Sequence, residues 1–117
     1  MVYTKRYEDS YLDKDDEEIE GVSDEDRLVG LIQKADKSDR DHSIIHKLTD
    51  RLTNGAKMPG EPGKIALDGL KMAAGAYRDT GQNEAAIAIW ARLVEVGEMT
   101  GNKDLYYEAT DQMANIG

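Results

Sequence analysis

Residues 64–117 read KIALDGLKMAAGAYRDTGQNEAAIAIWARLVEVGEMTGNKDLYYEATDQMANIG and predict three helices, separated at Asp79-Thr80-Gly81 and at Gly101. Apolar residues in each helix recur three or four positions apart and therefore share one face. They are Ala66, Leu70, Ala73, Ala74 and Tyr77, then Ala86, Ile89, Trp90, Leu93 and Val94, then Leu105, Tyr106, Ala109, Met113 and Ile116. Asn83 and Asn102 are the predicted N-caps. The short connections predict antiparallel neighbours.

The small and large residues of this stretch resemble the tetratricopeptide repeat, whose consensus runs Trp-x2-Leu-Gly-x2-Tyr, a turn Gly and Ala-x3-Phe, with a closing Pro. Tyr77, Gly81 and Ala86 fall on the family's Tyr, turn Gly and Ala. Four places differ: Leu70 replaces Trp, Ala73-Ala74 replace Leu-Gly, Trp90 replaces Phe, and Glu98 stands where the Pro is expected. Met113-Ala114 look like a further Leu-Gly pair, so the resemblance covers about one and a half repeats.

The resemblance implies peptide or protein binding on the concave side of the helical hairpins. It places Lys71, Tyr77 and Arg78 of the first helix at that surface, with Asn83 near its mouth. A free-standing solenoid needs about three repeats. Either the N-terminal helices complete the core, or the chain forms a homodimer through its last helix, using Tyr106, Tyr107 and Met113.

Composition predicts an all-α fold of about five short antiparallel helices in one small domain. The chain has 117 residues, 39% of them hydrophobic, with no Phe and two Pro. It has no Cys, which excludes disulfides and thiolate metal sites. No apolar run approaches membrane-spanning length and no apolar segment follows Met1, so we expect a cytoplasmic protein with no membrane partner.

The net charge of −9 is concentrated at the N-terminus. Residues 1–26 hold three cations and eleven anions, whereas the remainder is close to neutral. We therefore expect residues 1–22 to be a disordered acidic tail, because they cannot bury enough apolar surface to offset the entropy of ordering. Tyr3, Tyr7 and Tyr11 recur every four residues, and they are either incidental or a recognition element that folds on a partner or on this chain's own helices.

Residues 23–55 predict a separate helix pair at the start of the domain 23–117. Ser23 is the predicted cap of a helix over 24–37, and a second helix is expected over 41–53. Residues 54–63, NGAKMPGEPG, hold three Gly and both Pro and predict the only substantial internal loop. That loop would separate the helix pair from the repeat-like residues 64–117.

Candidate chemistry in the sequence is thin. His42 and His46 lie four apart on one helix face, but Ser43 stands where a metalloprotease helix carries Glu and there is no third His, so we expect surface histidines without a metal or cofactor. The glycines before Lys64 lack the register of a phosphate-binding loop. Trp90 and the Met residues are expected in the core.

The sequence therefore favours a non-enzymatic interaction module that binds a peptide or protein. No nucleophile, base and orienting group stand at a recognisable spacing. Lys and Arg are interleaved with acids, which argues against direct nucleic-acid binding. The alternative hypothesis is a small acidic inhibitor or nucleic-acid mimic, which would act on a basic DNA- or RNA-binding protein through residues 8–26.

Overall fold

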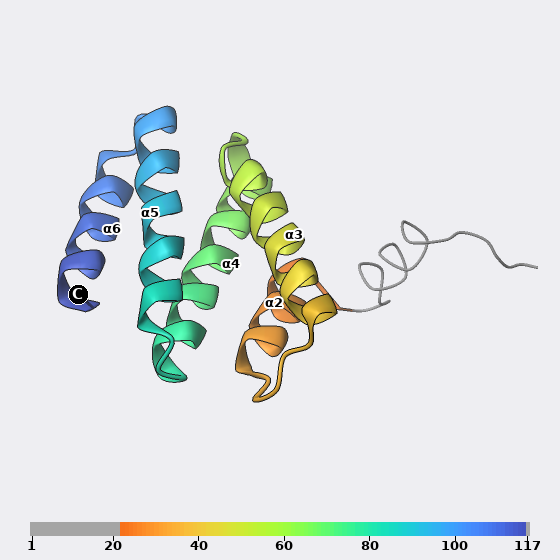
Figure 1. The fold of residues 1–117 in the computed structure, drawn as a ribbon. Coiled ribbons are helices and arrows are strands. Elements are labelled where there is room, and N and C mark those ends of the chain that lie inside the picture. Colours follow the sequence, from red (N-terminus) through yellow and green to blue (C-terminus); the bar gives the residue numbers. More distant parts are fainter. Residues whose placement is uncertain (1–21, 117) are drawn as a thin grey trace, which may run out of the picture.

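A computed structural model describes residues 22–116, which form five helices and no strand (Figure 1). They are α2 (Asp24–Gln33), α3 (Asp39–Ala56), α4 (Gly60–Asp79), α5 (Asn83–Thr100) and α6 (Lys103–Ile116). Successive helices from α3 to α6 run antiparallel, so α3 and α5 point the same way with α4 behind and between them. The predicted all-α class is confirmed. The predicted acidic tail, 1–22, lies outside the described residues except for Val22, which is exposed.

The helix starts follow the chemistry of the capping residues. Ser23 caps α2, its Oγ accepting from the Asp26 N–H at 3.2 Å, as predicted. Ser38 caps α3 reciprocally with Asp41, so the predicted break at residues 37–40 is in part the first turn of that helix. Asn102 Oδ1 accepts from the Leu105 N–H at 3.1 Å, which confirms that cap. Each cap satisfies N–H groups that have no partner inside the helix.

Two predicted boundaries are wrong at the N-terminal helix pair. The first helix ends at Gln33, not at residue 37, because Lys34 turns to an extended conformation and its ammonium reaches Asp41 at 2.8 Å. The second helix continues to Ala56, three residues beyond the predicted end at residue 53. As a result, residues 34–38 connect α2 to α3, and this connection is longer than residues 57–59 between α3 and α4.

The predicted loop over residues 54–63 is also wrong, since only residues 57–59 separate α3 from α4. Pro62 lies in the first turn of α4, where a residue needs no backbone N–H. Gly63 is buried there, and a Cβ at this position would overlap the carbonyl oxygen of Met58. The Gly and Pro residues thus make a tight helical corner and not a flexible connector.

One apolar core runs through all five helices. Its fully buried large side chains come from α2, α3, α4 and α5: Leu28, Ile32, Leu48, Leu70, Leu93 and Val96. Trp90 is buried as predicted, but Met58, Met72 and Met99 are exposed, so the prediction of core methionines is wrong for these three. At the far end, α6 packs mainly against α5, where Gly97 lets the backbone of Tyr106 approach closely.

Candidate binding groove between α3 and α5

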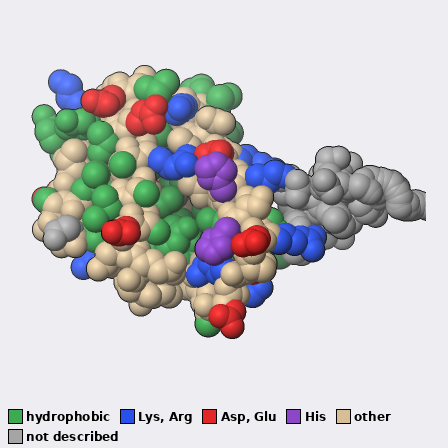
Figure 2. All heavy atoms as spheres, in the orientation of Figure 1, with side chains coloured by type: hydrophobic (Ala, Val, Ile, Leu, Met, Phe, Trp, Pro, Cys, Tyr) green, Lys and Arg blue, Asp and Glu red, His purple; other side chains and the backbone are tan. Residues whose placement is uncertain are grey.

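Two hollows lie along α5, one between α3 and α5 and one between the end of α5 and the corner where α3 meets α4. The first hollow, of about 230 Å³, is lined by His42, Ile45, His46, Thr49, Tyr77, Ala85, Ala88, Ile89 and Arg92. The second, of about 370 Å³, is lined by Ala56, Met58, Gly63, Lys64, Leu67, Val96, Thr100, Asn102 and Leu105. We call these two surfaces together the α3–α5 groove. Figure 2 shows hydrophobic side chains exposed between the two helices.

Helical periodicity explains why the two hollows follow one line. On α5 the lining residues fall at 85, 88, 89, 92, 96 and 100 and share one helix face, whereas α3 contributes residues 42, 45, 46 and 49 to the first hollow and only Ala56, seven positions later, to the second. Helix α4 supplies Leu67 and Tyr77 beneath them. The distance from His42 to Ala56 along α3 is about 21 Å at 1.5 Å per residue.

Arg92 crosses the groove between the two hollows. Its Nη1 donates to Asp50 Oδ1 at 2.8 Å and to Thr53 Oγ1 at 3.2 Å, joining α5 to α3. The other carboxylate oxygen of Asp50 lies 3.3 Å from His46 Nε2, one helical turn earlier. The Arg92 guanidinium and the His46 ring thus both meet the one carboxylate of Asp50.

The two threonines of α3 are turned into the helix and do not interrupt the apolar lining. Thr49 Oγ1 donates to the Ile45 carbonyl and Thr53 Oγ1 to the Thr49 carbonyl, both at 2.7 Å. Since these hydroxyls are satisfied locally, the methyl groups are left for packing. Both residues are buried.

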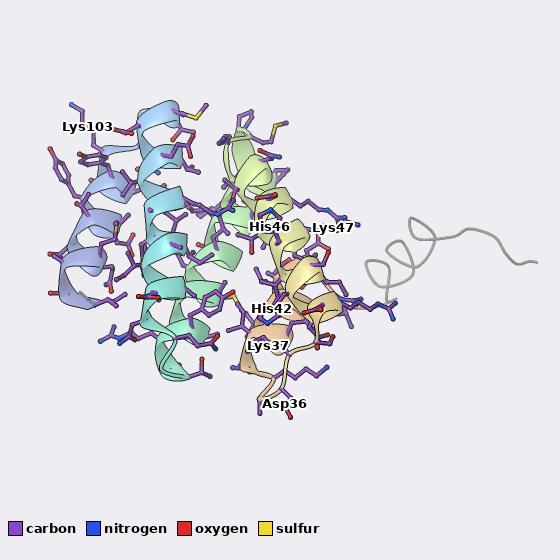
Figure 3. All side chains as sticks on the ribbon, viewed as in Figure 1. Asp36, Lys37, His42, His46, Lys47 and Lys103 are labelled. Atoms are coloured by element: carbon purple, nitrogen blue, oxygen red, sulfur yellow. The ribbon has the colours of Figure 1, made fainter. Side chains whose placement is uncertain are left out.

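His42 and His46 lie on the side of α3 that faces α5, whereas Lys47 lies on the opposite side (Figure 3). Both histidines are exposed. Within residues 22–116 no group of three or more His, Asp or Glu side chains could hold a metal ion. The histidine pair therefore contributes polar edges to the first hollow.

The structure separates the four predicted binding residues of the repeat-like part. Tyr77 is buried at the floor of the first hollow, and burial raises the pKa of its hydroxyl. Lys71 instead reaches α6, where its ammonium lies 2.8 Å from Glu108. Arg78 is exposed at the end of α4. Asn83 is the first residue of α5 and not its cap, which is Gln82, so that capping prediction is wrong.

The predicted tail residues Tyr3, Tyr7 and Tyr11 lie outside the described residues.

Of the three residues predicted to form a dimer interface on α6, only one is fully exposed. Tyr107 is exposed and packs edge-to-face on Tyr106 at 5.7 Å between ring centroids, whereas Tyr106 and Met113 are half-buried. The homodimer stays a prediction.

The sequence did not predict the α3 side of the groove or the role of Arg92 in it. His42, Ile45 and His46 were seen as helix residues but not as one side of a groove, because the repeat-like pattern begins only at Lys64. Arg92 resembles any solvent-facing cation in the sequence. Arg92 reaches Asp50 because the fold places α5 next to α3.

Comparison of the chain with protein-family models, with curated proteins and with solved structures finds no match. No helix in the described part of the chain combines the length and the apolar character that crossing a bilayer requires.

Proposed function

We propose that this protein is a non-enzymatic interaction module that binds a short amphipathic helix of a partner protein in the α3–α5 groove. The observation that carries the proposal is the pair of hollows along one face of α5, the first of them between α5 and the parallel helix α3. A helix of about 14 residues would match the groove's length at 1.5 Å per residue. Laying the apolar face of a helix into such a groove is a common mode of peptide recognition.

The charges at the groove favour a ligand with carboxylates beside its apolar stripe. Lys64 borders the second hollow, and His42, His46 and Arg92 border the first. The carboxylate that meets this edge, Asp50, is already bound by Arg92 and lies beside His46. An anionic side chain on the ligand would therefore meet cationic and imidazole side chains and little repulsion, which sets orientation and specificity more than affinity.

The resemblance to tetratricopeptide repeats is consistent with this proposal, because that family binds peptides between its helical hairpins. It rests on Tyr77, Gly81, Ala86 and the substituted positions around them. Tyr77 is the one residue that the resemblance and the groove share. The alternative of an acidic inhibitor depends mostly on residues before Val22, and it stays a prediction.

Two exposed alanines on α5 provide a matched test. Ala88 lines the first hollow, whereas Ala91, three residues later, does not line either hollow. The probe is a 14-residue synthetic helix with Leu at every third or fourth position and Glu on its flanks. Methyl NMR of the full chain would follow Ile45, Leu67, Ala88 and Ile89 during titration, and circular dichroism would check the fold of each variant.

We expect shifts at these methyl groups in the native chain. Ala88→Glu should weaken binding about tenfold, which corresponds to about 1.4 kcal/mol, because the carboxylate would be buried against the ligand's apolar face. Ala91→Glu should bind like the native chain. The proposal fails if the probe perturbs the part of α6 beyond Leu105 and not the groove, or if both variants bind equally well.

A further inference from the structure

The outer side of the α2–α3 pair carries a row of basic side chains. Arg40, Lys47 and Arg51 are spaced seven and four residues apart on α3, which places them on one helix face, away from the groove. Arg27 on α2 lies one turn after Asp24, whose carboxylate pairs with Arg51 at 3.1 Å. We call these four cations the basic face.

The described chain begins beside one end of this face. Val22 precedes the N-cap of α2, and the Asp24–Arg51 contact holds that end of α2 against α3. Residues 8–20, a short distance before Val22 in the sequence, hold eight carboxylates and the single cation Lys14. A strongly acidic segment is thus tethered next to four cations, and tethering keeps its local concentration high.

The dimensions of the segment and the face agree. From Arg40 to Arg51 the face is about 17 Å long at the helical rise, and thirteen residues in a helix would extend about 20 Å. In a helix, Asp9, Asp13, Asp16, Glu17 and Glu20 would recur every three or four positions and share one side. Since the tether is at Arg51, Glu20 would lie toward Arg51 and Glu8 toward Arg40.

We propose that the basic face of α2 and α3 is the docking surface for this chain's own acidic segment, residues 8–20. The docked segment covers Arg40, Lys47 and Arg51 and leaves the α3–α5 groove open, because Lys47 lies on the side of α3 opposite His42 and His46 and the helical spacing puts Arg40 and Arg51 on the face of Lys47. Charge attraction holds it, so salt or a competing basic protein would release it. This inference is independent of what the groove binds.

A spin label can test where the segment lies. The chain has no Cys, so Ser10→Cys in the full-length protein creates a single thiol for a nitroxide. Paramagnetic broadening of the backbone amides would then map its position. Docking places residue 10 near the Arg40 end of α3, so amides around residues 40–43 should lose the most intensity. A freely moving tether would instead centre the effect on the start of α2.

Charge reversal on the basic face gives the matched control. Arg40→Glu/Lys47→Glu should abolish broadening at the Arg40 end, whereas Arg78→Glu/Lys103→Glu, two exposed cations elsewhere, should leave it unchanged. Combining Asp13→Lys/Glu17→Lys in the acidic segment with Arg40→Glu/Lys47→Glu on the basic face should restore the broadening at the Arg40 end. In the labelled chain without these reversals, the broadening should disappear at about 1 M NaCl, where the Debye length is about 3 Å.

Three results would overturn the proposal. One is broadening centred on the tether in every variant. Another is broadening on α5, at the groove, that survives the charge reversal. The third is an effect seen only between a labelled chain and a separate isotope-enriched chain, which would mean that the segment docks on a second copy.

Discussion

Asp41 is a buried carboxylate that ties the start of α3 to the end of α2. Its Oδ2 accepts from the Lys34 ammonium at 2.8 Å and from the Ser38 N–H at 2.9 Å. The hydrogen bond from Lys34, followed by that from the Ser38 backbone, lowers the pKa of Asp41 from 3.8 to about 2. These bonds favour the charged carboxylate in the folded protein.

The lowered pKa predicts a specific acid dependence of stability. Because the folded pKa lies below the unfolded one, the Asp41 contribution is fully present above about pH 4 and is lost as the pH falls toward about 2. Asp41→Asn should therefore lower the melting temperature at pH 6, and its difference from the native chain should shrink between about pH 4 and pH 2.

Thermal unfolding followed by circular dichroism at a series of pH values would measure this difference. Asp36→Asn is the control, since Asp36 is exposed in the same connection and should change stability by less than about 0.5 kcal/mol. A gap between Asp41→Asn and the native chain that stays constant from pH 6 to pH 2 would contradict the assignment.

At the scale of the helix, two of the four glycines of α4 have opposite surroundings. Gly63 is pressed against the Met58 carbonyl, whereas a Cβ at Gly75 would meet nothing within 4 Å. Gly63→Ala should destabilise the protein by about 1–3 kcal/mol, because the backbone of the α3–α4 corner must move. Gly75→Ala should stabilise it by about 0.5–1 kcal/mol through the better helix propensity of Ala.

Urea unfolding of both alanine variants would separate the two effects. The pair is matched, since both glycines lie within α4 and receive the same methyl group. If Gly63→Ala were as stable as Gly75→Ala, the tight corner between α3 and α4 would be disproved.

The same corner shows which parts of the helices could be predicted from the sequence. Apolar periodicity located the faces of α4 and α5 correctly, because burial decides them. Gly81 and Gly101 have positive φ at the ends of α4 and α5, as expected for helix-ending glycines. Residues 54–63 were misread because Gly and Pro usually mark loops, whereas here Pro62 fits a first turn and Gly63 a close approach.

At the scale of the whole molecule, α6 is the last described helix and lies at one end of the fold. It packs mainly on α5 and buries only Leu105 and Ala109, and a single ion pair from Lys71 reaches it from α4. Few buried contacts mean a low free energy of local opening. We expect α6 amides to exchange hydrogen much faster than those of α3 and α4.

Hydrogen–deuterium exchange with peptide mass spectrometry would measure this order. Comparing dilute and concentrated samples also tests the predicted homodimer, because a dimer through α6 should slow its exchange as concentration rises. Protection of α6 equal to that of α4 at low concentration would contradict the packing argument.

The groove also belongs to the whole molecule, which is why the sequence alone did not predict it. His42 and Ile45 come from one helical hairpin and Ala88 and Arg92 from the next, and no local pattern links them. Tyr77 was predicted as a binding residue from the family resemblance, and the structure places it on the groove floor. Lys71 was predicted from the same resemblance, but its ammonium pairs with Glu108 on α6 and it does not line the groove.

The Arg92 crossing has a consequence for the speed of binding. A ligand that occupies one hollow leaves the contacts of Arg92 with Asp50 and Thr53 intact, so its association should need no rearrangement. A ligand that extends through both hollows must displace this side chain or arch over it, and required conformational changes lower association rates. Short and long ligands of equal affinity should therefore differ in their kinetics, because the long ligands should both associate and dissociate more slowly.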